Sequence, residues 1–115
     1  MSPVSPPVSD MLVTVKSREV QRALLAEMRQ DRAAAVRHFL AAAHLELVLA
    51  DDYRQAGEGE LALRSELSAA SCFWRGGERE EAEALLQSLL RAHPAQATEI
   101  QQVSEELARE YPAGP

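Results

Sequence analysis

The chain has 115 residues, of which 46 % are hydrophobic and 26 % are charged, as expected for one folded soluble domain. Its single cysteine, Cys72, excludes a disulfide framework and a cysteine-based zinc site within one chain. No uninterrupted run approaches the roughly 18 apolar residues of a membrane-spanning helix. The first ten residues lack the basic start and apolar core of a signal peptide, so we expect a cytoplasmic protein.

The net charge of −6 is unevenly distributed. Residues 1–56 carry seven basic and seven acidic side chains, whereas residues 57–115 carry five basic and eleven acidic ones. An acidic surface repels a phosphate backbone. We therefore expect no nucleic-acid partner, and without a membrane-spanning run we expect no membrane partner either.

The apolar fraction consists mainly of Ala and Leu, and the charged fraction is rich in Glu and Arg. These residues lose little side-chain freedom in a helix, so composition predicts an all-α fold. Residues 1–9 are rich in Pro and Ser and are expected to be a flexible tail. Met11–Val15 is the only β-prone run, and we expect either an extended lead-in or a strand that pairs with a second chain. The expected divisions are residues 1–16, a helical domain at 17–111, and a frayed end at 112–115.

The first helix is expected from Ser17, as N-cap, to about Gln30. Its apolar face carries Val20, Leu24 and Met28. A basic stripe follows the opposite face, with Arg32 as a further candidate at the end of the helix: Arg18, Arg22, Arg29 and Arg32. This stripe is either a solvated face or a docking stripe for an acidic surface, such as residues 57–115 of a second copy.

The second helix is expected from Asp31 or Arg32 to about Gln55. Its apolar stripe is rotated away from that of the first helix, which predicts a break near Gln30–Arg32 with Asp31 as the cap. One continuous helix over residues 17–55 is the alternative. Because the second helix is apolar on two sides, we expect it to be the central one.

Three further helices are expected between turn signals, at about 60–74, 78–93 and 95–110. Glycines near residues 57 and 77 suit left-handed helix ends, and Pro94 ends the fourth helix. Three features recur after 20 residues, namely an aromatic residue, a glycine and an alanine: Tyr53 and Phe73, Gly57 and Gly77, Ala62 and Ala82. We therefore expect about five helices in antiparallel helix–turn–helix hairpins.

Residues 63–94 resemble one tetratricopeptide repeat, a helix–turn–helix unit. The residues that carry the resemblance are Ala70, Phe73, Gly77, Ala82, Leu86, Leu89 and Pro94. The chain departs from the family at Glu66, where a large aromatic residue is expected, and in its period of 20 rather than 34 residues. The fold is thus a tetratricopeptide-like stack or an unrelated small helical bundle.

The resemblance implies a peptide- or protein-binding groove lined by the first helix of each hairpin. By position, that groove would comprise Arg64, Leu67, Ser71, Trp74 and Arg75, together with His44, Leu47, Asp51, Arg54 and Gln55. Three of these residues are equally compatible with a position in the core, namely Leu47, Leu67 and Trp74.

The sequence contains no constellation of catalytic or metal-binding residues. Its three histidines, His38, His44 and His93, lack metal-ligand spacing, and no nucleophile–base pair can be assembled. We expect neither enzymatic activity, nor a cofactor, nor a metal. The sequence favours a protein–protein interaction module, acting as adaptor, chaperone or assembly subunit, which binds a partner protein or itself as a homo-oligomer. The alternative is a small regulatory bundle associated with an enzyme complex.

Overall fold

The computed structural model describes residues 6–112, and within this range the chain contains five α-helices and one short 3-10 helix. These elements are α1 (Pro6–Met28), α2 (Arg32–Gln55), α3 (Gly59–Arg75), α4 (Arg79–Ala92), η1 (Pro94–Gln96) and α5 (Ala97–Glu110). The described residues form no strand. The predicted all-α class is therefore confirmed.

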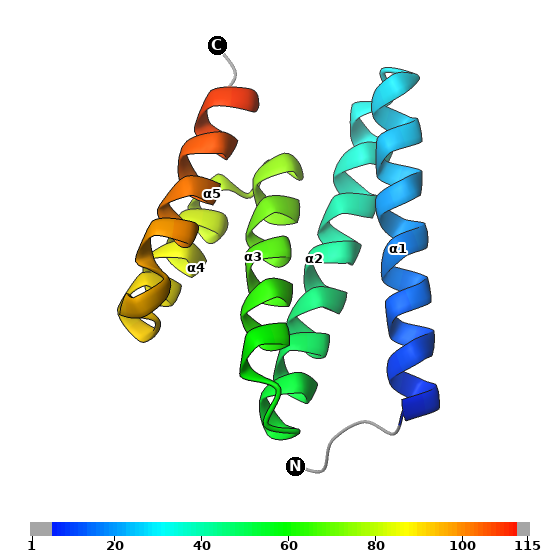
Figure 1. Cartoon of the computed structure of the whole chain (residues 1–115). Coiled ribbons are helices and arrows are strands. Elements are labelled where there is room, and N and C mark those ends of the chain that lie inside the picture. Colours follow the sequence, from blue (N-terminus) through cyan, green and yellow to red (C-terminus); the bar gives the residue numbers. More distant parts are fainter. Residues whose placement is uncertain (1–5, 113–115) are drawn as a thin grey trace.

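The helices form a flat layer with a two-helix cover at one edge. α1, α2 and α3 lie side by side, and α4 and α5 pack against the edge of α3 that faces away from α2 (Figure 1). α2 contacts α1 on one side and α3 on the other, whereas the backbones of α1 and α3 do not approach each other. The prediction that the second helix is central is confirmed, and α1 is left as an edge helix.

The first three turns of the chain share one hydrogen-bond pattern. Each contains a residue with positive φ: 60° at Gln30, 79° at Gly57 and 86° at Gly77. The amide of the next residue donates to a carbonyl five positions back, at 2.8–2.9 Å, which is the bond that defines a Schellman end. The geometry confirms the two glycine stops and adds a third turn, at Gln30, that the sequence does not mark with glycine.

The break between α1 and α2 lies where the phase change of the apolar stripe predicts it. Asp31 caps α2, since its side chain accepts a hydrogen bond of 3.1 Å from the amide of Ala34. The amide of Asp31 itself donates to the carbonyl of Ala26 at 2.9 Å. The alternative of one continuous helix from 17 to 55 is therefore wrong.

The expectation of an extended or strand-forming Met11–Val15 segment is wrong, because these residues lie inside α1. The helix starts at Pro6 rather than at Ser17, so residues 6–16 are not a tail. Each β-branched residue costs a helix only a few tenths of a kcal/mol, and packing on α2 outweighs that cost. Ser9 illustrates this packing, since its hydroxyl donates to the buried Asp52 at 2.9 Å. Residues 1–5 and 113–115 lie outside the described residues.

Alanine is the commonest residue of the core, and its small side chain lets the helices approach closely. α1 packs on α2 through Ala23, which is fully buried, and Ala26. The expected apolar face of this helix is only partly used, since Val20 packs against the core while Leu24 and Met28 are exposed. The tertiary structure therefore rotates α1 away from the orientation that its largest apolar residues predict.

Of the described helices, α2 alone is long and apolar enough on average to cross a membrane. The central helix of a soluble bundle has the same composition, because it is covered on two sides. Phe39 and Leu49 of α2 are almost fully buried within the protein. Its apolar character is thus accounted for by the fold.

Candidate interaction surface

The basic stripe of the first helix lies at the open edge of the molecule. Arg18, Arg22 and Arg29 are all exposed on α1. Arg32 is exposed as well, but it begins α2 and its guanidinium lies beside Gly77 in the turn between α3 and α4. Three of the four predicted residues therefore share one surface, and Arg32 belongs to another.

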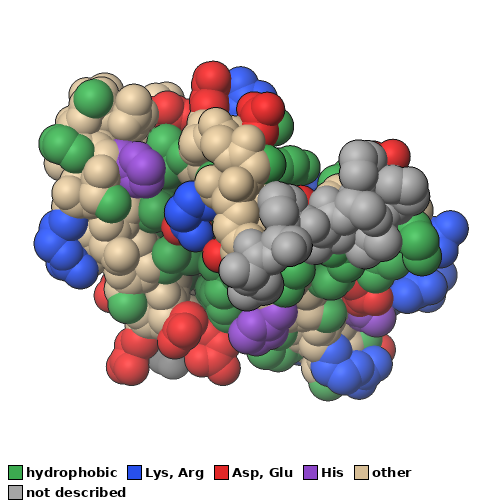
Figure 2. Space-filling model, turned by 90° about the horizontal axis from the view of Figure 1, so that it is seen from below, with side chains coloured by type: hydrophobic (Ala, Val, Ile, Leu, Met, Phe, Trp, Pro, Cys, Tyr) green, Lys and Arg blue, Asp and Glu red, His purple; other side chains and the backbone are tan. Residues whose placement is uncertain are grey.

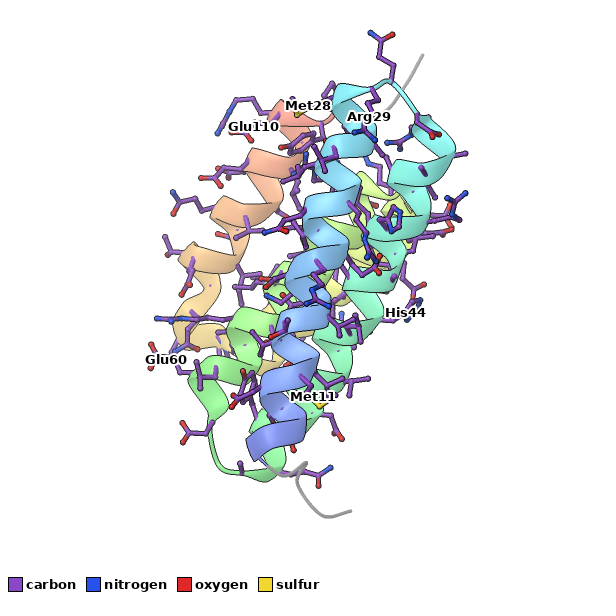
Figure 3. All side chains as sticks on the ribbon, turned by 90° about the vertical axis from the view of Figure 1, so that its right-hand side faces the viewer. Met11, Met28, Arg29, His44, Glu60 and Glu110 are labelled. Atoms are coloured by element: carbon purple, nitrogen blue, oxygen red, sulfur yellow. The ribbon has the colours of Figure 1, made fainter. Side chains whose placement is uncertain are left out.

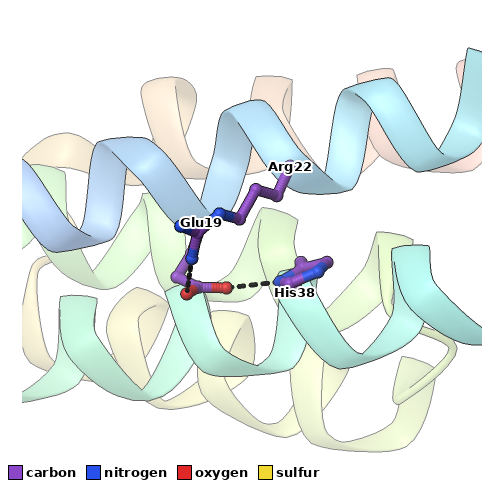
Figure 4. A network of polar contacts seen from close by, with 3 residues as sticks. All are labelled: Glu19, Arg22 and His38. Carbon is purple, nitrogen blue, oxygen red and sulfur yellow. Dashed lines mark hydrogen bonds and ion pairs between the residues drawn. The ribbon is translucent and has the colours of Figure 1, made fainter.

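Glu19 connects this edge to α2. Its carboxylate lies 2.5 Å from Nδ1 of His38 and accepts a hydrogen bond of 3.2 Å from Arg22, as Figure 4 shows. Glu19 thereby neutralises part of the charge of Arg22. Arg18 and Arg29 extend the positive surface on either side of this pair.

The open edge is also the most apolar part of the described surface. The described residues include eight exposed large apolar side chains, and six of them lie on α1: Met11, Val13, Val15, Leu24, Leu25 and Met28. Figure 3 looks directly onto this helix, with Met11 near one end and Met28 near the other. A surface helix normally turns such residues inward, so α1 exposes more apolar surface than its place at the edge of a soluble fold requires.

The opposite edge of the molecule has a different character. The outward faces of α4 and α5 carry exposed glutamates, including Glu80, Glu81, Glu105 and Glu106, and no large apolar residue is exposed on either helix. In Figure 2, basic side chains project at the right-hand edge, where α1 and α2 lie, while acidic ones gather at the lower left, on the side of α4 and α5. A polar outer face is typical of a helix that closes a stack.

Two residues of the predicted groove on α3 belong to the core instead. Leu67 and Trp74 are both buried. The indole Nε1 of Trp74 donates to the backbone carbonyl of Tyr111 at 2.7 Å, and the guanidinium of Arg79 covers its ring at 4.1 Å from the centroid. The alternative of a core position is therefore the right one for both residues.

Arg75, also predicted to contact a partner, is engaged within the protein. Its Nη2 donates to Glu27 of α1 at 2.7 Å. Its guanidinium lies 4.7 Å from the ring centroid of Phe39 and 4.4 Å from that of Tyr111. With a side chain only 21 % exposed, Arg75 joins α1, α2, α3 and the end of α5 rather than reaching toward a ligand.

The remaining groove residues do not form one surface. Arg64 is exposed and lies 3.8 Å from Glu60, and the hydroxyl of Ser71 donates to the carbonyl of Leu67 in its own helix. Arg54 forms an ion pair with Glu66, and it also lies 3.8 Å from Asp51.

Glu66 and Arg64 are two positions apart on α3 and point about 200° apart around the helix axis. The two predicted halves of the groove, represented by Arg54 and Arg64, therefore lie on different sides of α3.

A buried polar cluster joins the three helices of the layer. Glu46 of α2 is 4 % exposed, lies 3.8 Å from Nζ of Lys16 and accepts hydrogen bonds from Ser68 and Ser65. Burial raises the pKa of the Glu46 carboxyl, against the opposing effects of Lys16 and the two serines. Burial, together with the nearby carboxylate, also raises the pKa of the Cys72 thiol to about 11, so Cys72 stays protonated and unreactive at neutral pH.

No cluster of three or more potential metal ligands occurs among the described residues. No protein-family model matches this chain, and neither does any curated protein or solved structure. The resemblance of residues 63–94 to a tetratricopeptide repeat therefore stays a prediction.

Sequence reasoning found the arginines of α1 but missed its exposed apolar residues. The signal that could have found them is the adjacent pair Leu24 and Leu25. Consecutive residues of a helix point about 100° apart, so an edge helix packed through one narrow face cannot cover both. The sequence does not reveal that α1 is an edge helix. The exposure of Leu24 and Leu25 therefore follows only from the packing of the helices.

Proposed function

We propose that this protein is a small protein–protein interaction module that binds a partner protein or a second copy of itself through the outward surface of α1. One observation carries the proposal: six of the eight exposed large apolar side chains lie on this helix, beside Arg18, Arg22 and Arg29. Interfaces combine desolvated apolar contacts with arginine in this way.

Two further features support the proposal. The α3–α4 hairpin has the turn and the small contact residue that a tetratricopeptide-like hairpin needs, with Gly77 at positive φ and Ala82 fully buried. The polar outer faces of α4 and α5 suit the closed end of a helical stack, and α1 then corresponds to the open end. Such a module acts as adaptor, chaperone or assembly subunit and needs no catalytic group.

The proposal is tested by affinity capture from the native host with three versions of the chain. The wild-type chain is compared with Arg18→Glu/Arg22→Glu and with the control Arg91→Glu/Arg109→Glu, whose arginines are exposed on α4 and α5. We expect the α1 variant to lose the proteins that the wild type and the control both retain. Equal capture by all three versions would contradict a role for α1.

A further inference from the structure

One side of α1 carries an apolar stripe without charge. Counting along the helix, positions 13, 17, 20, 24 and 28 recur at intervals of three or four and therefore share one side. We call these residues, with the adjacent Gln21, the α1 seam: Val13, Ser17, Val20, Gln21, Leu24 and Met28. Its three exposed apolar residues are Val13 at 37 %, Leu24 at 39 % and Met28 at 80 %, and Gln21 is exposed beside them.

The seam is complementary to its own reversed copy. If a two-fold axis passes between Val20 and Gln21, each residue of one copy faces the residue of the second copy that lies equally far from the axis, so that the two residue numbers add up to 41. Val13 then meets Met28 of the second copy, and Ser17 meets Leu24 of the second copy. Small side chains thus oppose large ones along the whole seam, as helices that pack knobs into holes require, and antiparallel orientation aligns the helix dipoles favourably.

Charge selects the seam over the other exposed side of α1. Arg18, Arg22 and Arg29 lie well over 60° around the helix from the centre of the seam, so two copies can approach without bringing them together. Glu27, which borders the seam, is neutralised by Arg75 at 2.7 Å. A reversed contact through the basic stripe would instead place Arg18 and Arg22 of both copies around the axis, at a cost from like-charge repulsion.

Among the described residues, only α1 offers enough exposed apolar surface to cover the seam. The other exposed large apolar residues of the described chain are Val48 on α2 and Leu61 on α3, which stand alone on their helices. The exposed faces of α4 and α5 offer none. A second α1 is the surface that matches the seam in length, polarity and side-chain size.

From these observations we infer that two copies of this chain form an antiparallel dimer through their α1 seams. The inference rests on the proposed function and names the partner. At 1.5 Å per residue, α1 is about 34 Å long. One helix pair of that length buries an area at the low end of specific interfaces, so we expect a dissociation constant in the micromolar range.

The first experiment measures mass by sedimentation across protein concentration, for the wild type and two adjacent leucine variants. Leu24→Gln alters the seam, and Leu25→Gln alters a residue of similar exposure, 47 %, outside it. We expect the wild type and Leu25→Gln to dimerise, and Leu24→Gln to remain monomeric with a dissociation constant raised at least tenfold. Thermal unfolding at low concentration checks that both variants fold.

Salt distinguishes this dimer from a charge-driven one. We expect the seam dimer to persist or strengthen in 1 M NaCl, since burial of apolar surface is not screened. A dimer that dissociates in high salt would overturn the inference in favour of docking between the basic stripe and the acidic half of a second copy. Equal effects of Leu24→Gln and Leu25→Gln, or a monomer up to millimolar concentration, would also overturn it.

The second experiment measures the orientation of the two helices with nitroxide labels at Met11 or Leu25, which are exposed outside the seam, in a Cys72→Ala background. Antiparallel pairing separates the two copies of residue 11 by about 28 Å along the helix axis, but those of residue 25 by only about 14 Å. Parallel pairing gives equal separations and would overturn the inference. A monomer whose α1 arginines are still required for partner capture leaves the proposed function standing, so the two failures are distinguishable.

Discussion

Arg75 of α3 and Glu27 of α1 are joined at 2.7 Å, although the backbones of these helices do not contact each other. The guanidinium spans this gap across the surface of α2 and is held between the rings of Phe39 and Tyr111. One side chain thereby ties the edge helix to the C-terminal end of the fold.

We expect Arg75→Ala to lower the free energy of unfolding by about 2 kcal/mol, since it leaves Glu27 without its cation and removes the ring contacts. Arg75→Lys should recover less than half of that loss, because an ammonium cannot stack flat between two rings. Urea unfolding measures both values, and Arg64→Ala, which changes an exposed arginine of the same helix, is the control. Full recovery by lysine would show that charge alone matters.

The shared turn geometry predicts substitutions of opposite sign. Gln30 has a φ of 60°, a backbone conformation that glycine adopts more easily than a residue with a Cβ atom. We therefore expect Gln30→Gly to raise the free energy of unfolding by about 0.5–1 kcal/mol. Gly77 has φ of 86°, and a Cβ there would meet only Arg32, at the ordinary distance of 3.7 Å. Gly77→Ala should therefore cost about 1 kcal/mol from backbone strain alone. Melting temperatures of the two variants would contradict this account if both moved in the same direction.

Glu46 should make stability depend on pH. Its pKa is raised in the folded state, so the folded protein binds the proton more tightly than the unfolded chain does. Its contribution is complete below the unfolded pKa near 4.5 and is lost as the pH rises through the folded pKa. We expect Glu46→Gln to gain stability relative to the wild type over that range, by at most about 1.4 kcal/mol per pH unit.

Chemical denaturation of the wild type and Glu46→Gln from pH 4 to pH 8 measures this difference. Glu60→Gln is the matched control, because the side chain of Glu60 is 85 % exposed. A constant difference between wild type and Glu46→Gln across the range would show that Glu46 has the same pKa in both states.

The hydrogen bond between Ser9 and Asp52 predicts that the first turns of α1 depend on the end of α2. We expect Ser9→Ala to speed hydrogen exchange in the N-terminal turns of α1 while costing only about 1 kcal/mol overall. Ser88→Ala is the control, since Ser88 is exposed on α4, away from this bond. Unchanged exchange before residue 15 would contradict the role of this bond.

Local signals in the sequence were sufficient to predict α2 to α5 and the turns between the helices. Gly57, Gly77 and Pro94 mark ends that local backbone physics imposes wherever they occur. Asp31 caps α2 as predicted because a cap bond reaches only three residues along the chain. The predictions failed at Met11–Val15, where weak strand preferences yield to packing on α2.

Whether an individual side chain on those helices is buried or exposed depended on how the helices pack. Trp74 and Arg75 are adjacent in the sequence, yet Trp74 lies in the core and Arg75 joins α3 to α1, α2 and the end of α5. The positions of α1 and α5 decide this difference, and no local sequence signal predicts them. Leu24 and Leu25 resemble core residues in any local window, and both remain exposed because α1 is an edge helix that packs through Ala23 and Ala26. Helix formation is decided mostly within a few residues, whereas exposure depends on which distant helix packs nearby. The sequence alone therefore determined the elements except the first turns of α1, and only the tertiary structure decided those turns and the surface.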